Sequence, residues 1–460
     1  MRAFRGSAVV LTPVAVLLGS IALFGGKVFP NPLMTPDSAG VLANYSTNGG
    51  IDINNPFFQS LGSNGRTCNT CHISSSAWTI TPADVQAKFN ATQGMDPIFR
   101  TNDGSNCPSA DVSTVAARQQ AYSQLLSKGL IRISESVPAN AEFQIISIQD
   151  PYNCPETRAS SLAMYRRPLP ATNLKFLSTI MWDGRETVFG AIPGKSIDLN
   201  QSLMNQAKDA TTGHAQGLVP SAQQVAQIVA FETGVFSAQA NDQGAGSLTA
   251  QGALGGAVNL SQQNTFVGIN DSLGGDPTGA TFDPNVFTLY GAWANAGSPY
   301  RQSVARGENL FNNLPIPITG VGGLNDALNQ PVIMGTCTTC HDGPNAGNHS
   351  FSVPLAIGTT AYPAMPALDV AGLPVYTIRC IATGVTVQVT DPGRAMVSGK
   401  CKDIGKLKGP VLRGLAARAP YFHNGAAATL DDAVEFYDQR FNLNLTQQQK
   451  ADLVAFLKTL

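Results

Sequence analysis

Two copies of one short cysteine motif constrain this chain more than any other feature. Residues 66–74 read RTCNTCHIS and residues 336–344 read GTCTTCHDG, so a C-x-x-C-H sequence occurs twice. Two thiols at this spacing can add to the two vinyl groups of one haem, and the histidine that follows can then ligate the iron. A zinc site would need four ligands, and neither motif has an obvious second pair of ligand residues nearby. The sequence therefore predicts two covalently bound c-type haems.

The attachment residues and the iron ligands follow directly from the two motifs. They are Cys68, Cys71 and His72 for the first haem, and Cys337, Cys340 and His341 for the second. Residues 306–311, with the sequence RGENLF, lie ahead of the second motif and resemble the N-terminal helix of a cytochrome c domain.

The N-terminus predicts export from the cytoplasm. Arg2 and Arg5 precede an apolar run from Ala8 to Phe24, which is typical of a signal peptide. The run lies at the lower limit of membrane-spanning length, so an uncleaved anchor is the alternative. We expect residues 1–26 to be one of the two, and the rest of the chain to lie in a bacterial periplasm.

The cysteines outside the motifs fit an oxidising compartment. Proximity in the sequence suggests that Cys107 pairs with Cys154 and that Cys380 pairs with Cys401, although other connectivities are allowed. Only 13% of the 460 residues are charged and the formal net charge is −1, which argues against nucleic acid as a partner.

We expect a mainly α fold of two cytochrome c-like haem domains, with long loops and little β structure. The N-terminal domain would span residues 31–299 and the C-terminal domain residues 300–460. Helical apolar spacing is found at residues 81–93 and 113–130. It occurs again after Thr429 and Thr446, which we expect to be N-caps. Residues 238–283 are rich in Gly, Asn and Gln and predict a long surface excursion.

The order of motifs along the chain resembles that of the bacterial dihaem cytochrome c peroxidases and MauG-type enzymes. The first C-x-x-C-H is followed by MWDGRE at residues 181–186, the second C-x-x-C-H, APYFHNG at 419–425 and FYD at 436–438. The resemblance covers most of the chain from about residue 50 on. It implies an N-terminal haem that reacts with hydrogen peroxide or oxygen and a C-terminal haem that transfers electrons.

The resemblance also implies roles for single residues around the second haem. Trp182 matches a tryptophan that relays charge between the haems, and Arg185 would pair with a haem propionate or with Asp183. Tyr437 stands where the second iron receives its other axial ligand, with Met396 as the rival. A phenolate oxygen is a hard anionic donor that stabilises ferric iron and lowers its reduction potential.

The expected distal side of the first haem departs from the peroxidase pattern. Gln206 matches the family glutamine, but the position ten residues later is Gln216, where peroxidases have a glutamate. A glutamine can hydrogen-bond an oxidant but cannot shuttle a proton. His214 is a candidate acid–base group or sixth ligand. Dioxygen chemistry, as in the related dihaem rubber oxygenases, is therefore an alternative to peroxide chemistry.

Further expectations from the resemblance concern calcium and partners. Family members bind calcium between the domains partly through main-chain carbonyls, and Arg418 and Pro420 match two of these. His423 would lie near the second haem or between the haems without ligating iron. The partner would be a small cytochrome c or cupredoxin, or a protein substrate. A pure dihaem electron carrier is the alternative outside enzymes.

Overall fold

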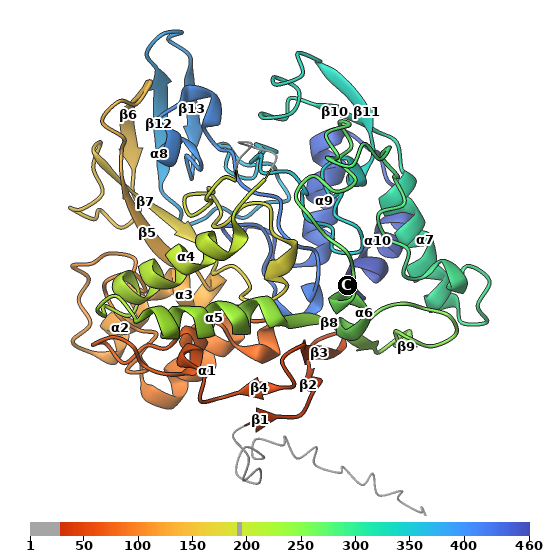
Figure 1. Ribbon diagram of the computed structural model, residues 1–460. Helices are drawn as coiled ribbons and strands as arrows, with labels where there is room; N and C mark the ends of the chain where they lie inside the picture. The colour runs from red at the N-terminus through yellow and green to blue at the C-terminus, as the bar shows by residue number, and fades with distance from the viewer. Residues whose placement is uncertain (1–27, 191–195) are drawn as a thin grey trace, which may run out of the picture.

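The computed structural model describes residues 28–190 and 196–460, which form helical groups flanked by small antiparallel sheets (Figure 1). The segment predicted to be a signal peptide or anchor, residues 1–26, lies outside the described residues. Among the residues that are described, no helix is long and apolar enough to cross a membrane.

The helices of the described chain are α1 (Pro82–Thr92), α2 (Val115–Ala121), α3 (Ser123–Lys128), α4 (Leu199–Gly213), α5 (Ala222–Gly234), α6 (Ala257–Ser261), α7 (Pro299–Asn313), α8 (Ala395–Ser398), α9 (Leu430–Phe441) and α10 (Gln447–Lys458). The strands are β1 (Val28–Phe29), β2 (Leu33–Pro36), β3 (Gly40–Ser46), β4 (Ile51–Asp52), β5 (Ile131–Ser136), β6 (Phe143–Gln149), β7 (Ser161–Arg166), β8 (Val235–Asp242), β9 (Gly246–Ser247), β10 (Ile316–Thr319), β11 (Val332–Gly335), β12 (Val375–Cys380) and β13 (Thr386–Val389).

Helices begin where the sequence supplies N-caps. Thr81, Thr429 and Thr446 each accept a hydrogen bond from the backbone N–H three residues on, in a capping box that starts α1, α9 and α10. These predicted helices are confirmed. The predicted helical stretch at 113–130 forms two short helices, α2 and α3, because the backbone leaves helical geometry at Tyr122.

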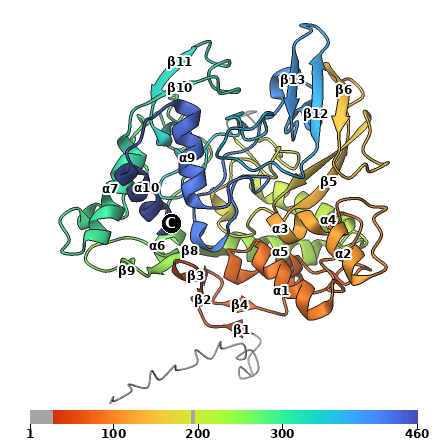
Figure 2. The ribbon, with the colours of Figure 1, turned by 180° about the vertical axis from the view of Figure 1, so that it is seen from behind.

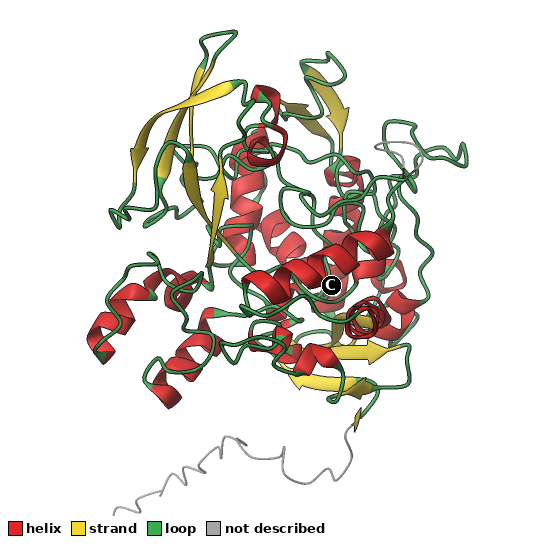
Figure 3. Ribbon diagram, turned by 60° about the vertical axis from the view of Figure 1, so that its left-hand side comes forward, coloured by secondary structure: helices red, strands yellow, loops and turns green. Residues whose placement is uncertain are grey.

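The expected mainly α fold with little β structure is wrong, because the described residues are 28% helix and 18% strand. Segments for which we predicted no strand pair as antiparallel strands: β5 with β7, and β6 with β12, which also pairs with β13. These segments are rich in β-branched and aromatic residues, which favour a pleated, half-buried surface. Strands β6 and β12 lie far apart in the sequence, so no short pattern reveals that they pair. Figure 3 shows the strands in yellow beside the helices in red.

The predicted surface excursion at residues 238–283 also begins inside the fold. Ala238 belongs to β8, which pairs with β3 and β9 and is buried along most of its length. Further on, Leu248 is fully buried in the core that contains Val304 of α7 and Phe456 of α10. The Gly-rich composition of this segment therefore accompanies close packing as well as exposed turns.

The two motifs lie in separate helical groups. In the first group, α4 and α5 pack together, and Phe57, Leu203 and Ile228 form the core beside the first motif. In the second, α7 packs extensively on α10, which also contacts α9, on the other side of the molecule (Figure 1, Figure 2). Each group thus supplies its own apolar core beside one C-x-x-C-H motif.

Segments from the two sides of the predicted domain boundary are interleaved. Strand β6 pairs with β12 across it, and Tyr290 is buried with Phe456 of α10. The boundary between residues 299 and 300 itself stays a prediction.

The expected cysteine pairs are both present as disulfides, Cys107–Cys154 and Cys380–Cys401. The four motif cysteines form no disulfide, so their thiols are available for attachment to haem.

Candidate haem sites

Both C-x-x-C-H motifs fold into the same tight turn. At the first, a 3₁₀ turn at Cys68–Thr70 brings the backbone N–H of His72 to the Cys68 carbonyl at 3.0 Å. At the second, a 3₁₀ turn at Cys337–Thr339 brings the N–H of His341 to the Cys337 carbonyl at 3.1 Å. A threonine before each turn is bonded to the threonine three residues on, in a capping box. The repeated motif therefore gives the same arrangement of two thiols and one imidazole at each place.

Each motif histidine is oriented through its Nδ1 atom. Nδ1 of His72 lies 2.9 Å from the carbonyl oxygen of Trp78, and Nδ1 of His341 lies 2.7 Å from that of Gly347. A carbonyl partner requires the proton on Nδ1, which leaves Nε2 as the free electron-pair donor. Burial lowers the pKa of His72 to about 4. A neutral imidazole with a free Nε2 is the form that binds iron.

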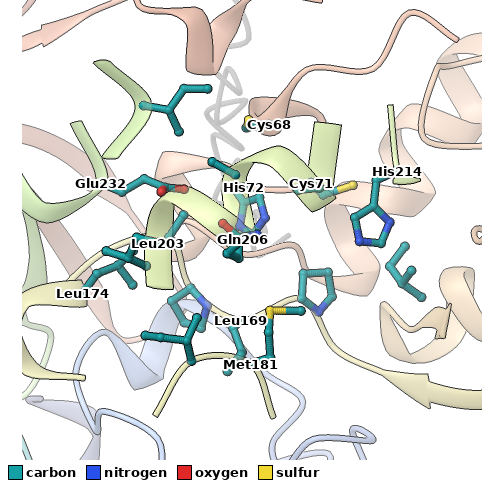
Figure 4. Close-up of a pocket in the computed structure, with 18 of the residues that line it drawn as sticks. Cys68, Cys71, His72, Leu169, Leu174, Met181, Leu203, Gln206, His214 and Glu232 are labelled. Carbon is teal, nitrogen blue, oxygen red and sulfur yellow. The ribbon is translucent and has the colours of Figure 1, made fainter. Parts of the chain in front are cut away.

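A cavity lies beside each motif, and both have mainly aliphatic walls. The first is lined by Cys68, Cys71, His72 and Gln206, which are drawn in Figure 4. Its aliphatic lining residues include Leu169, Leu174, Met181, Leu203 and Ile228. The second is lined by the residues of the second motif and by Ile316, Ile318, Leu355, Ile357 and Leu457. Walls of this kind suit the apolar faces of a porphyrin.

The wall between the cavities is rich in cations. The residues that line both cavities are Arg167, Pro168, Pro170, Trp182, Lys408, Pro410 and Arg418. Burial lowers the pKa of Lys408 to about 7 and that of Arg418 to about 10. Nε of Arg418 has no hydrogen-bond partner in the part of the chain that is described. Buried cations need anionic partners, and the propionates of a haem would supply them. The residues present therefore fit c-type haem.

Trp182 lies in this shared wall. Its Nε1–H donates to the carbonyl oxygen of Arg167 at 2.8 Å. Its ring meets that of His423 edge to face, with centroids 6.2 Å apart. His423 is buried and lines the second cavity. The two aromatic side chains thus form a continuous contact between the cavities.

Arg185 lines the first cavity but is already paired with carboxylates. Its guanidinium donates to both carboxylate oxygens of Asp183, at 3.0 and 2.5 Å, and also contacts Glu135. Asp183 also accepts from Arg166, which binds Asp391 on its other side. Of the two partners expected for Arg185, the structure has Asp183.

The three distal candidates of the first site do not all lie at the cavity. Gln206 and His214 line the first cavity, whereas Gln216 is exposed and does not line it. Helix α4 ends at Gly213 and the backbone turns to φ 53° at Gln216, whose side-chain oxygen accepts from Asn64 at 3.4 Å. The structure therefore brings together Gln206 and His214 but not Gln216.

His214 is held by a buried carboxylate that the sequence analysis missed. Its Nδ1 lies 2.5 Å from Oδ2 of Asp103, whose Oδ1 accepts from Arg66 at 2.5 Å. Burial favours the neutral form of Asp103, but the contacts with His214 and Arg66 outweigh it and lower the pKa of Asp103 below its ordinary value. An ionised, buried aspartate fixes the imidazole and can stabilise its positive charge.

Tyr437 lines the second cavity together with the second motif. It projects from α9 and packs among Phe422, Phe436 and Phe441. The rival Met396 is buried in a different core, with Tyr376 and Ile378 of β12, and does not line the cavity. Of the two candidates for the second axial ligand, only Tyr437 is placed beside the site.

Of the two residues expected to bind calcium, Arg418 belongs to the shared wall and Pro420 does not. Pro420 lines the second cavity, and the carbonyl oxygen of Arg418 accepts a hydrogen bond from Nη2 of Arg167 at 3.1 Å. No group of three or more His, Cys, Asp or Glu that could hold a metal ion occurs within residues 28–190 and 196–460.

Glu232, which was not predicted from the sequence, lines the first cavity from α5. It is 6% exposed, and its Oε2 has no partner among the described residues. Burial raises the pKa of this carboxyl to about 8. The available signal was an acidic residue at the apolar spacing of Val225, Ile228 and Val229 on an amphipathic helix.

Comparison with known proteins identifies relatives over part of the chain. No family model matches. Over 139 residues, 27% of this chain, it is 33% identical to the cytochrome-c peroxidase IdrP1 of Denitromonas iodatirespirans. Over 146 residues, 30% of this chain, it is 32% identical to the cytochrome c551 peroxidase of Nitrosomonas europaea. Over this part of its length, the chain is similar to bacterial cytochrome c peroxidases.

The match is confined to part of these peroxidases. It spans 36% of the length of each of the two, and 22% of the cytochrome c peroxidase Ccp of Escherichia coli. A solved structure of a MauG-like protein associated with microbial copper homeostasis aligns over 88% of this chain and 85% of its own, at 16% identity and a TM-score of 0.38, too low to relate the two folds. Kinship with cytochrome c peroxidases agrees with c-type haem as the cofactor that the motifs and cavities fit.

Proposed function

We propose that this chain is a dihaem oxidoreductase of the peroxidase and MauG type. Hydrogen peroxide would react in the first cavity, and oxidising equivalents would pass through Trp182 to the second. The observation that carries the proposal is the position of Trp182, which lines both cavities and contacts His423. An indole can be oxidised transiently, so a tryptophan in the common wall divides one long electron path into two short ones.

Bound haem would supply the iron that meets the oxidant in the first cavity and exchanges electrons in the second. In the first cavity, the side-chain amide of Gln206 would hydrogen-bond the oxidant and orient it. His214 would accept a proton from peroxide and return it to the departing oxygen. Asp103, 2.5 Å from Nδ1 of His214, would stabilise the ring while it carries the proton. These residues supply a proton route although Gln216 lies outside the cavity.

In the second cavity, Tyr437 would provide an anionic oxygen ligand, whereas His341 would provide a neutral imidazole nitrogen. The position of Tyr437 on α9 beside Cys337 and Cys340 supports this role. A hard anionic donor favours the oxidised state of iron. The second site would therefore hold oxidising equivalents rather than deliver electrons at high potential.

We further propose that the protein works in the periplasm. The support is the N-terminal sequence and the two disulfides, which persist in oxidising compartments. The electron donor would be a small cytochrome c or cupredoxin, or the reductant would be a residue of a protein substrate. Fractionation of the native host, with mass measurement of the mature N-terminus, tests the location.

One experiment tests the reaction. The purified protein carrying both haems is mixed with one equivalent of hydrogen peroxide, and optical and EPR spectra are followed with and without reduced cytochrome c. A long-lived oxidised state supports a MauG-like function, and rapid turnover with the cytochrome supports a peroxidase. Absence of any reaction with peroxide would overturn the proposal.

A second candidate is an oxygenase that acts on an apolar substrate. The aliphatic lining of the first cavity and the position of Gln216 outside it favour this alternative. The same protein, reduced and exposed to oxygen, would then show a stable oxygen complex by optical spectroscopy. A rapid return to the ferric spectrum would count against the oxygenase.

A further inference from the structure

One buried arginine joins three backbone segments at the wall between the cavities. Nη1 of Arg167 donates to the carbonyl oxygen of Lys128 at 2.8 Å. Nη2 donates to the carbonyl oxygens of Ile80 at 2.8 Å and Arg418 at 3.1 Å. The side chain is buried, with 5% of the residue exposed. Its planar guanidinium therefore bridges carbonyls from residues far apart in the chain.

The backbone of Arg167 strengthens the same junction. Its N–H donates to the carbonyl oxygen of His423 at 2.6 Å, and its own carbonyl accepts from Nε1 of Trp182 at 2.8 Å. One residue thus connects the N-terminal segments to residues 418–423. Both residues of the aromatic contact between the cavities are bonded to it.

Carbonyl oxygens that converge in this way attract a cation, and Arg167 already supplies one. Ca²⁺ takes six to eight oxygens and commonly includes carboxylates. Here one expected ligand, the carbonyl of Arg418, is bonded to Arg167, and the guanidinium of Arg418 is a second cation in the same wall. The carboxylate that interacts with Arg167 is Asp84, which accepts hydrogen bonds from Ser76 and Thr81. Asp183 and Asp391 are bonded to Arg166. The residues present do not fit a calcium ion at Arg418.

We infer that the guanidinium of Arg167 is the resident cation of this junction and that it takes the place of calcium between the two haem sites. Arginine suits the role because its fork of fixed donors reaches several oxygens at once. A side-chain cation also cannot be removed by a chelator, so the junction would hold its geometry whatever the calcium concentration.

Hydrogen exchange measured by mass spectrometry tests this in the protein carrying both haems. Wild type is compared with Arg167→Met, each in calcium chloride and in EGTA. We expect the exchange of peptides covering residues 79–81 and 416–424 to be the same in both solutions for wild type. In Arg167→Met it should be about tenfold faster or more, with no recovery in calcium.

Arg132→Met is the matched control. Arg132 is also a buried arginine bonded to carbonyls, but these belong to Thr101, Asn102 and Ser105. Its loss should speed exchange around residues 101–105 and leave 416–424 unchanged. If Arg167→Met does not fold, Arg167→Lys keeps the charge with fewer directed donors and should show intermediate exchange.

Two results would overturn the inference. One is faster exchange of wild-type residues 416–424 in EGTA that calcium reverses, which would place an ion at the junction. The other is unchanged exchange in the Arg167 variants. Both readouts are independent of peroxide turnover, so the inference and the proposed function can fail separately.

Discussion

At the scale of single residues, the two haem sites differ in the groups that accompany their motifs. The first cavity has Gln206 and the Asp103–His214 pair, which can handle protons. The second has Tyr437, packed among aromatic rings, which can donate an oxygen to a metal. This asymmetry is the chemical basis for assigning the oxidant to one site and electron storage to the other.

Replacing Tyr437 should change the second haem specifically. We expect Tyr437→Phe to alter the optical and EPR signals of that haem, because an oxygen ligand would be lost. Tyr437→Met should raise its reduction potential by on the order of 0.1 V or more, since a thioether favours the reduced state. Spectroelectrochemistry measures both changes.

Tyr421→Phe is the control for this variant. Tyr421 lines the same cavity, but its hydroxyl donates to the carbonyl oxygen of Leu415 at 2.9 Å. Its replacement should leave the spectrum and potential of the second haem unchanged. Equal spectra for wild type and Tyr437→Phe would remove Tyr437 from the ligand set.

Loss of the proton route should slow the reaction with peroxide. We expect His214→Ala to lower its second-order rate constant by about 10²-fold or more, the usual contribution of a positioned acid–base group. Asp103→Asn should have a smaller effect in the same direction, because the imidazole remains but is no longer stabilised when charged. Stopped-flow mixing with peroxide measures both rate constants.

Thr212→Ala, at the exposed end of α4, serves as the control for the His214 variant and should react like wild type. A rate for His214→Ala within about twofold of wild type, far below the usual acid–base contribution, would show that His214 carries no proton in this reaction.

Where a short motif fixes the local backbone, the sequence indicated residues that the fold brings to a cavity. The C-x-x-C-H turns, Trp182 and Tyr437 all line one. Gln216 was assigned by counting ten residues from Gln206, but that count crosses the end of α4, where the chain changes direction. Arg167 and Asp103 were missed because their importance comes from burial and distant partners, which no local pattern records.

At the scale of elements, α5 carries a buried carboxyl into the first helical group. Glu232 stands on the face of α5 that also buries Val225, Ile228 and Phe231. Burial raises its pKa from 4.5 to about 8. The folded protein therefore keeps this proton over a pH range in which the unfolded chain has lost it.

This helix should make stability depend on pH. Between pH 4.5 and about 8 the folded state binds one proton more than the unfolded state. Glu232 therefore lowers the free energy of unfolding by about 1.4 kcal/mol for each unit that the pH rises. We expect Glu232→Gln to remove that slope. The stability of the variant minus that of wild type should therefore be larger at pH 7.5 than at pH 5. Thermal unfolding of the haem-loaded proteins across this range measures it.

Gln223→Glu adds a carboxyl to the exposed face of the same helix and should leave the pH slope of wild type unchanged. Parallel pH profiles for wild type and Glu232→Gln would mean that Glu232 is ionised in the folded protein.

Helices were predictable and sheets were not, for a physical reason. A helix is stabilised by neighbours in sequence, so the capping boxes at Thr81, Thr429 and Thr446 disclose where α1, α9 and α10 begin. A strand is completed by a partner that can lie anywhere in the chain. The pairing of β6 with β12 is of this kind, and neither segment was predicted to be a strand.

At the scale of the whole molecule, the two cavities share a wall that is built from loop residues. The cations Arg167, Lys408 and Arg418 and the indole of Trp182 lie in this wall. Its segments come from both halves of the chain, so the sites are built around a common boundary. This arrangement makes communication between the sites a property of the assembled fold rather than of either group alone.

Removing the indole should therefore uncouple the sites without dismantling them. We expect Trp182→Phe to bind both haems and to retain the first step with peroxide, while electron transfer between the sites slows by about tenfold or more, equivalent to ~1.4 kcal/mol in the barrier. Stopped-flow optical spectra that separate the two haems measure this rate. Trp293→Phe is the control, because Trp293 is a fully buried tryptophan that lines neither cavity. Equal transfer rates in wild type and Trp182→Phe would route the electrons elsewhere, and the shared wall would then serve only to hold the two groups together.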